Sequence, residues 1–156
     1  MLAALAAVAA ATLLWWAWRR YRNRPKPPID PYVRAQQEFA GIEARRLLDA
    51  GRSAEYFAEI VDVTREYLAA RVPGVRRSDT TSELLRAMKP REGIEAELAG
   101  LLERGDLVKF ARAEPSREEA REAGRALRAI VDHVEVRLNP ESEIGKRIAS
   151  ARERAA

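Results

Sequence analysis

His133 is the only histidine of the 156-residue chain, and the sequence contains no cysteine. Nucleophile triads and imidazole or thiolate metal sites need several such residues, and this composition does not supply them. We therefore interpret His133 as a surface or partly buried residue of a helix. Acidic pairs such as Glu118 with Glu119, or Glu95 with Glu97, are adjacent or two apart, so they do not face a common point on a helix. These acidic pairs therefore do not predict a general acid and a general base.

The eight glycines are scattered at the ends of predicted helices, and none forms a glycine-rich phosphate loop. The sequence therefore predicts no catalytic residue, no metal and no cofactor. We expect a protein that is not an enzyme.

The most distinctive local sequence is GDLVKFAR at residues 105–112. Its apolar residues suit a core in which Lys109 and Arg112 reach outward along the surface. They equally suit a surface segment that presents Lys109 and Phe110 to a partner. Arg76 and Arg77, just before the Thr80 cap, are either solvated arginines or a second docking patch. The candidate partner-binding residues are Arg76, Arg77, Asp106, Lys109, Phe110 and Arg112.

Residues 2–18 carry no charge, and Thr12 is their one polar member. As a helix they extend over about 25 Å, which is the short end of a bilayer crossing. Tryptophans at the end of this run and arginines directly after it fit a membrane interface. A cleaved signal peptide would carry its positive charge before the apolar run, not after it. The sequence predicts a transmembrane anchor whose interface residues are Trp15, Trp16, Trp18, Arg19, Arg20, Arg22 and Arg24.

Residues 19–29 join this basic run to three prolines, which favour an extended, stiff spacer. The positive-inside rule places the following domain in the cytoplasm, at the inner membrane, and the arginines can bind anionic lipid. Five of the 28 basic residues lie in residues 19–26, so the 24 acidic residues outnumber the basic ones elsewhere and leave a formal charge of −1. A nucleic-acid partner is therefore disfavoured for the domain.

Helical spacing continues through the rest of the chain. Asp30 before Pro31 predicts an N-cap, and this first helix is expected to run to Ala50, before Gly51. Apolar residues from Tyr56 to Val72 predict a second helix, antiparallel to the first because the connection is short.

Two capping boxes mark helix starts in the remainder of the predicted bundle. Thr80 with Glu83 opens a short helix, and Ser116 with Glu119 opens the longest one. Between them, Gly105 is expected to stop a helix, after which Asp106 caps a separate helical segment.

No stretch alternates as a strand would. The sequence predicts an all-α protein with one N-terminal transmembrane helix and a cytoplasmic bundle of five or six helices. Its parts are the anchor (1–18), the basic proline-rich spacer (19–29), the helical bundle (30–138) and a charged C-terminal tail (139–156).

Several landmarks resemble a membrane family. DPY at 30–32, AGR-x-x-EYF at 50–57, TTSELL at 80–85 and DLVKFAR at 106–112, together with the anchor and spacer, are similar to the cytoplasmic ends of BatD-like proteins. They are also similar to shorter domain-of-unknown-function relatives encoded beside MoxR-type AAA+ ATPases and von Willebrand A-domain proteins. The resemblance covers roughly residues 1–138, by packing and capping patterns and not by a catalytic signature.

This resemblance implies a non-catalytic accessory module of a membrane complex with MoxR-type ATPase and von Willebrand A-domain partners, in envelope assembly or stress tolerance. The large extracytoplasmic portion of BatD proteins has no counterpart in the sequence given, so its function does not carry over. The alternative is a membrane-bound DNA-binding regulator that uses residues 80–112 as a helix-turn-helix-like unit.

Overall fold

The computed structural model describes residues 29–88, 94–142 and 144–146, and these form five principal helices and no strand. The predicted all-α class is confirmed for this part of the chain. The helices are α2 (Pro31–Ala44), α3 (Ser53–Arg71), α4 (Thr81–Met88), α5 (Ile94–Ala111) and α6 (Arg117–Leu138).

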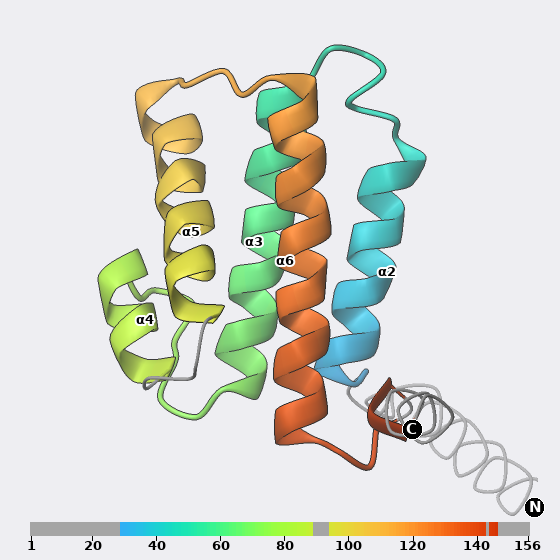
Figure 1. Ribbon diagram of the computed structural model, residues 1–156, viewed down its shortest axis with the longest axis vertical. Coiled ribbons are helices and arrows are strands. Elements are labelled where there is room, and N and C mark those ends of the chain that lie inside the picture. The colour runs from blue at the N-terminus through green and yellow to red at the C-terminus, as the bar shows by residue number, and fades with distance from the viewer. Residues whose placement is uncertain (1–28, 89–93, 143, 147–156) are drawn as a thin grey trace, which may run out of the picture.

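Helices α3 and α6 lie at the centre of the bundle, with α2 on one side and α5 on the other (Figure 1). The short α4 packs on α5 and covers only its lower part in this view. Helices α2 and α3 are antiparallel neighbours, as their short connection predicts. The chain enters α2 at the same end at which it leaves α6, and we call this end the base.

The core is made by the apolar stripes that the sequence shows. Phe39 of α2, Phe57 of α3 and Leu127 of α6 are almost fully buried, and Leu98 and Leu102 bring the inner face of α5 to the same core. Burial of such side chains stabilises each by about 1.5–3 kcal/mol, so periodic apolar faces are enough to hold the helices together.

Three predicted helix starts, those capped by Asp30, Thr80 and Ser116, are confirmed. The Asp30 carboxylate accepts hydrogen bonds from the backbone N–H groups of Tyr32 (2.9 Å) and Val33 (3.4 Å), with Pro31 in the first turn. Both capping boxes form as well, at the starts of α4 and α6. Their residues are Thr80 with Glu83 and Ser116 with Glu119.

The predicted end of the first helix is wrong. Helix α2 ends at Ala44, and residues 45–51 form turns. Arg46 adopts a positive φ of 49°, the left-handed conformation that commonly ends a helix. This reversal turns Leu47 into the core, where it is 3% exposed. The end of α2 at Ala44 is thus accompanied by burial of Leu47 through a turn and not through the continued helix that the sequence pattern suggested.

The predicted break at Gly105 is also wrong, because α5 is continuous from Ile94 to Ala111. A Cβ atom at Gly105 would lie 2.9 Å from Cγ2 of Val61. This glycine therefore serves the close approach of α3 and α5, and Asp106 lies in the middle of a helix where it caps nothing.

Within residues 29–88, 94–142 and 144–146, no helix is both long and apolar enough to cross a membrane. The predicted anchor (1–18) and nearly all of the basic spacer lie outside the described residues, and so do the interface tryptophans and arginines. Of the tail, residues 144–146 are helical, and the Lys146 N–H donates to the carbonyl of Ser142 (2.9 Å).

Candidate functional site

A groove lies where the seam between α3 and α5 is left uncovered. Helix α4 has eight residues, about 12 Å, whereas α5 has eighteen, about 27 Å, so α4 cannot cover the whole seam. The groove has a volume of about 350 Å³. We call it the α3–α5 groove. Its lining includes Ala58, Asp62, Arg65, Arg77, Thr81, Gly105, Asp106, Lys109 and Phe110.

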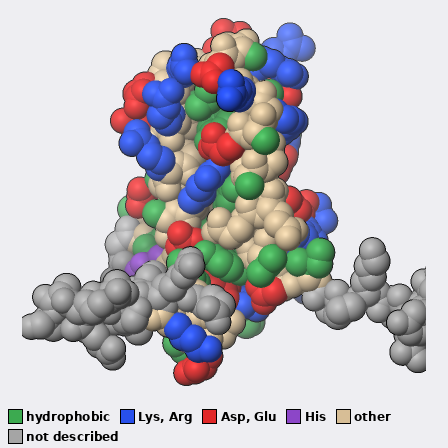
Figure 2. Space-filling model, turned by 90° about the vertical axis from the view of Figure 1, so that its right-hand side faces the viewer, with side chains coloured by type: hydrophobic (Ala, Val, Ile, Leu, Met, Phe, Trp, Pro, Cys, Tyr) green, Lys and Arg blue, Asp and Glu red, His purple; other side chains and the backbone are tan. Residues whose placement is uncertain are grey.

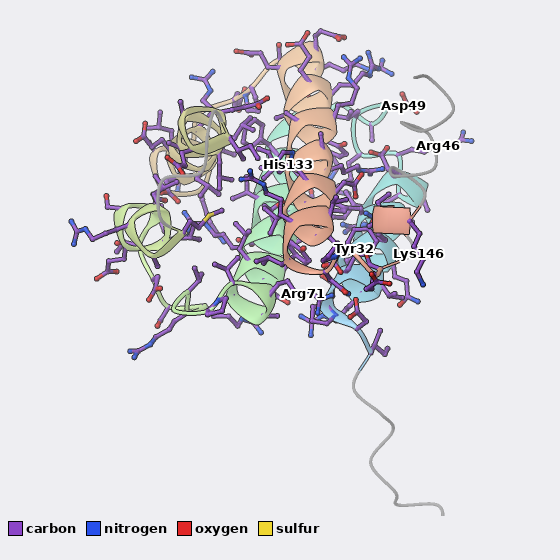
Figure 3. All side chains as sticks on the ribbon, turned by 60° about the horizontal axis from the view of Figure 1, so that its bottom comes forward. Tyr32, Arg46, Asp49, Arg71, His133 and Lys146 are labelled. Carbon is purple, nitrogen blue, oxygen red and sulfur yellow. The ribbon has the colours of Figure 1, made fainter. Side chains whose placement is uncertain are left out.

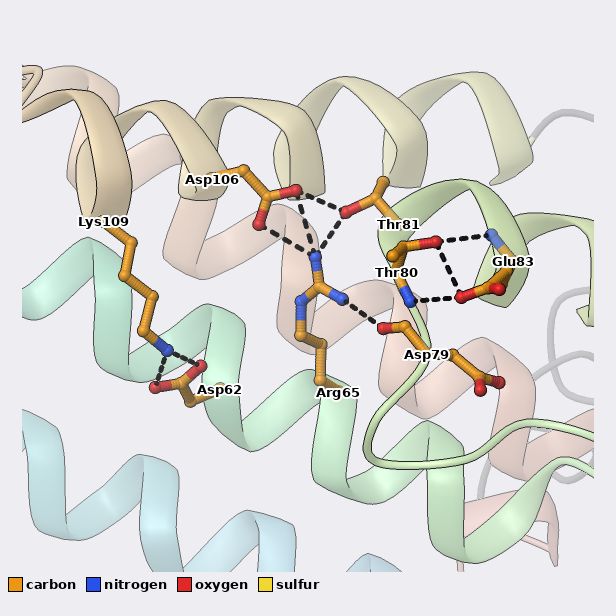
Figure 4. A network of polar contacts seen from close by, with 8 residues as sticks. All are labelled: Asp62, Arg65, Asp79, Thr80, Thr81, Glu83, Asp106 and Lys109. Atoms are coloured by element: carbon orange, nitrogen blue, oxygen red, sulfur yellow. Dashed lines mark hydrogen bonds and ion pairs between the residues drawn. The ribbon is translucent and has the colours of Figure 1, made fainter.

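Arg65 is the centre of the polar contacts in this groove (Figure 4). Its guanidinium donates to Oδ1 (3.0 Å) and Oδ2 (3.3 Å) of Asp106 on α5, to the Thr81 hydroxyl of α4 and to the Asp79 carbonyl oxygen (3.5 Å). The Thr81 hydroxyl donates in turn to Oδ2 of Asp106 (2.5 Å). One arginine of α3 thus joins the start of α4 to the middle of α5.

The capping box of α4 borders the same groove. Glu83 accepts hydrogen bonds from the backbone N–H (2.9 Å) and the hydroxyl (2.8 Å) of Thr80, and its own N–H donates back to that hydroxyl (3.3 Å). These hydrogen bonds, the backbone one first, lower the pKa of the Glu83 carboxyl below its ordinary value of 4.5. The cap fixes where α4 begins, and therefore how much of the seam stays open.

Lys109 and Asp62 form a second link across the groove. The ammonium of Lys109 on α5 lies 2.7 and 2.8 Å from the two carboxylate oxygens of Asp62 on α3. Both side chains are about half exposed, so this pair contributes little to stability. It marks the upper part of the groove, beyond the Arg65 contacts, in the direction of Phe110.

Phe110 carries the largest exposed apolar side chain of this region. It is 79% exposed, and Leu107, one turn earlier on the outer face of α5, is 49% exposed. Of the apolar residues in the distinctive segment, Val108 alone points into the core. The interpretation of that segment as core is therefore wrong for Leu107 and Phe110, which lie on the surface.

The structure brings four of the six candidate partner-binding residues to one place. Arg77, Asp106, Lys109 and Phe110 all line the α3–α5 groove. Arg77 also forms an ion pair with Glu66 of α3. The other two candidates, Arg76 and Arg112, are exposed but do not belong to the lining given for this groove.

Sequence analysis missed Asp62, Arg65 and Thr81. Each occupies a helical position at which a solvated polar residue is ordinary, and their partners lie far away in the chain. A carboxylate at residue 106 inside the distinctive segment was the one signal that pointed to this network. This signal did not identify Arg65 of α3 as the arginine that binds the Asp106 carboxylate.

A second polar network, at the base, was not predicted either. Glu135 of α6 is 1% exposed, and it accepts from the Arg71 guanidinium (2.8 Å), the Tyr67 hydroxyl (2.9 Å) and the Asn139 side-chain amide (3.1 Å). Arg71 also pairs with the Asp30 carboxylate (3.2 Å). Figure 3, in which the bottom of the bundle is turned forward, labels Arg71 of this network.

The contacts with Glu135 and the burial of this network shift the pKa values of Arg71 and Tyr67. The hydrogen bond from Arg71 to Glu135 raises the pKa of the guanidinium, and burial, together with the bond to Glu135, raises the pKa of the Tyr67 hydroxyl. Arg71 therefore stays charged and Tyr67 stays protonated. The network is suited to holding α3, α6 and the start of α2 together.

The charged groups of the groove are held mainly by contacts with one another. Arg65 pairs with Asp106 and Lys109 with Asp62, and no group of three or more His, Asp or Glu suited to a metal ion occurs in the described residues. His133 is exposed on α6 (Figure 3), in keeping with its interpretation as a surface residue.

Comparison of the chain with protein-family profiles, with curated proteins and with solved structures found no match. The contacts within the groove are therefore the basis for assigning a function.

Proposed function

We propose that this chain is a non-catalytic, membrane-tethered interaction module that binds a protein partner along the α3–α5 groove. The observation that carries the proposal is Phe110, an aromatic side chain that is 79% exposed at the edge of a groove. Exposed aromatic residues beside ion-paired polar groups are typical of the centres of protein interfaces.

The geometry of the groove supports this role. Phe110 and Leu107 offer apolar contact, while Lys109 and Arg77 supply polar groups at the edge. Since Lys109 is held by Asp62 and Arg77 by Glu66, these cations are positioned before a partner arrives. Such preorganisation lowers the entropy lost on binding.

The partners we propose are a MoxR-type AAA+ ATPase and von Willebrand A-domain proteins, because of the resemblance of the landmarks at 30–32, 50–57, 80–85 and 106–112. Two of these landmarks, the TTSELL and DLVKFAR segments, contribute residues to the groove. The tether we propose is the apolar run at 2–18, with its tryptophans and arginines at the inner membrane.

Photo-crosslinking in membranes tests this proposal. A photo-reactive phenylalanine analogue replaces Phe110 in the full chain, co-expressed with the ATPase and A-domain proteins encoded beside its gene. We expect an adduct with one of these proteins. The matched control places the same analogue at Ala40, which is exposed on α2 away from the groove.

Adducts of equal yield from both positions, or from neither, would contradict docking at the groove. A second measurement uses Phe110→Ala, which should weaken the affinity for the adducted partner by about tenfold or more if Phe110 is central to the interface.

The alternative, DNA binding by residues 80–112, has less support. The exposed cations of α5, Arg104 and Lys109, are each paired with a carboxylate, that of Glu119 and that of Asp62. Phosphate neutralisation provides most of the affinity of DNA-binding proteins, and cations that are already paired supply little of it. Salt-dependent binding of the detergent-solubilised chain to duplex DNA would favour the alternative.

A further inference from the structure

The base of the bundle gathers exposed cations from separate segments. Arg76 lies in the connection after α3, Arg137 in the last turn of α6, and Lys146 in the short helical segment that follows. Figure 3, in which the base is turned forward, shows Lys146 beside the start of α2.

These three cations are not used inside the fold. Within the described residues, none of them has a carboxylate partner, whereas Arg71 and Arg77 nearby are paired. Two carboxylates lie close to them in the chain: the exposed Glu141, and Asp79, which accepts a hydrogen bond from the Arg76 backbone N–H (2.8 Å). Three cations against these two carboxylates leave a net charge of +1.

Apolar side chains lie at the same end. Ile29, the first described residue, is 58% exposed, and Val33 in the first turn of α2 is 46% exposed. Figure 2 shows the side of the molecule formed by α2, where basic and acidic side chains are mixed in the upper part and hydrophobic ones gather lower down. Cations beside exposed apolar side chains are the combination that binds a lipid surface.

The proposed anchor and spacer precede α2, and they keep this surface close to the membrane. The basic residues of the spacer directly precede Ile29, and the pair between Asp30 and Arg71 fixes the start of α2 at the base. Ten residues, 19–28, separate the proposed anchor from Ile29, so the base stays within about 35 Å of the end of the anchor.

From these observations we infer that the base is a second lipid-binding surface, which rests on anionic headgroups through Arg76, Arg137 and Lys146. The inference rests on the proposed membrane tether. Each cation near such a surface strengthens binding by about fivefold. With the base on the lipid, the α3–α5 groove runs along the side of the bundle, and Phe110 lies near the end of α5 that is far from the membrane, open to a cytoplasmic partner.

A ladder of labels on α2 tests the orientation in the full chain. Since the sequence has no cysteine, Val33→Cys, Ala40→Cys and Ala44→Cys each introduce one thiol on the exposed side of the helix, at increasing distance from the base. A fluorophore at each site is measured in nanodiscs that contain a headgroup-spin-labelled lipid. With phosphatidylglycerol present, quenching should be strongest at residue 33 and weakest at residue 44, and this gradient should fade in phosphatidylcholine alone. Equal quenching at all three sites with phosphatidylglycerol overturns the inference.

Charge neutralisation provides the matched comparison. The combined variant Arg76→Gln, Arg137→Gln, Lys146→Gln should lower the docking equilibrium by up to about 100-fold and remove the gradient. The control, Arg46→Gln with Arg112→Gln, neutralises two exposed cations at the opposite end and should leave the gradient unchanged. If both variants act alike, the effect is general charge and the base is not the contact.

Alkaline carbonate extraction of native membranes separates this inference from the tether. A chain that resists extraction but shows no gradient supports the tether and contradicts docking of the base. A chain that is extracted, yet binds phosphatidylglycerol vesicles through the three cations, contradicts the tether and supports docking of the base. A chain that is extracted and does not bind vesicles overturns both.

Discussion

Helix α3 carries two arginines, Arg65 and Arg71, each of which bonds to a carboxylate of another helix, and the two differ in their surroundings. Arg71 meets Glu135, which is 1% exposed, whereas Arg65 meets Asp106, whose side chain is 38% exposed. The two guanidiniums are about equally exposed, at 20% for Arg71 and 19% for Arg65, so the difference lies in the carboxylates. Around Arg65 the short α4 leaves a groove open to solvent.

The difference teaches how the same chemistry serves two purposes in one bundle. A buried carboxylate with several donors is costly to leave unpaired, so the base network ties its helices into a fixed arrangement. The partly exposed pair of Arg65 and Asp106 is screened more by water and contributes less. It can hold α4 in place while the groove beside it stays open to solvent.

Removal of the buried carboxylate should have the largest effect. Glu135→Ala leaves Arg71 without its principal partner and Tyr67 without its acceptor, so we expect the free energy of unfolding to fall by about 3–5 kcal/mol. Urea unfolding followed by circular dichroism measures it. The control is Glu118→Ala, whose partners Arg121 and Arg125 are exposed, with an expected change of about 1 kcal/mol or less. Equal losses would remove the distinction between buried and open networks.

The glycines of α5 test how tightly the seam beneath the groove is packed. In Gly105→Ala, the added methyl meets Val61, and overpacking of about 1–3 kcal/mol should outweigh the gain of about 1 kcal/mol in helix propensity. In Gly100→Ala nothing lies within 4 Å of the new Cβ, so that variant should gain up to about 1 kcal/mol. The midpoint temperatures of thermal unfolding of these two variants, compared with the parent chain, measure the two effects. If both variants are stabilised, the close approach at Val61 is not a constraint.

Loss of the open network should be milder and local. Arg65→Met removes the donor shared by Asp106 and Thr81, so we expect a loss of about 1 kcal/mol, with faster amide exchange in α4 than in α2 or α6. Arg104→Met, which breaks an exposed pair with Glu119 on another helix, is the control. Uniformly faster exchange in all helices would show that Arg65 supports the whole bundle, as Arg71 does.

The two capping boxes should give the smallest effect, and it depends on pH. Hydrogen bonds from Thr80 and Ser116, the backbone ones first, lower the pKa of Glu83 and Glu119 below 4.5 in the folded chain. A lowered folded pKa contributes stability that is present above 4.5 and lost as pH falls through the folded value. Acid titration of unfolding should therefore be shallower in Glu83→Gln, Glu119→Gln than in the parent chain.

The control for this titration is Glu122→Gln, which removes an exposed carboxylate of α6 and leaves both caps intact. It should keep the acid-dependent loss of the parent chain. A double variant that titrates like this control would mean that the caps do not contribute to the pH dependence.

Local chemistry explains which features the sequence could predict. Caps act within three or four residues, so Asp30, Thr80 and Ser116 mark helix starts without reference to the rest of the fold. Apolar spacing likewise predicted the inner faces of α3 and α6. In the site, the same local signal singled out the segment 105–112 but left open whether Phe110 was core or surface.

The errors arose where a distant contact decided the outcome. Gly105 resembled a helix stop, yet Val61 of α3 requires a residue without a side chain at that point of a continuous helix. Leu47 extended an apolar pattern, yet its burial is reached by a turn at Arg46. Both cases depend on what packs against the residue, which no local pattern contains.

The sequence by itself determined the class of the fold, the helix starts at Asp30, Thr80 and Ser116 and the candidate residues of the segment 105–112, because caps and periodic apolar faces are set by neighbours in the chain. Only the tertiary structure decided which charges meet. Arg65 finds Asp106 and Arg71 finds Glu135 across 41 and 64 residues. Helix packing sets those distances and their exposure to water, and thereby separates a buried network at the base from an open groove between α3 and α5.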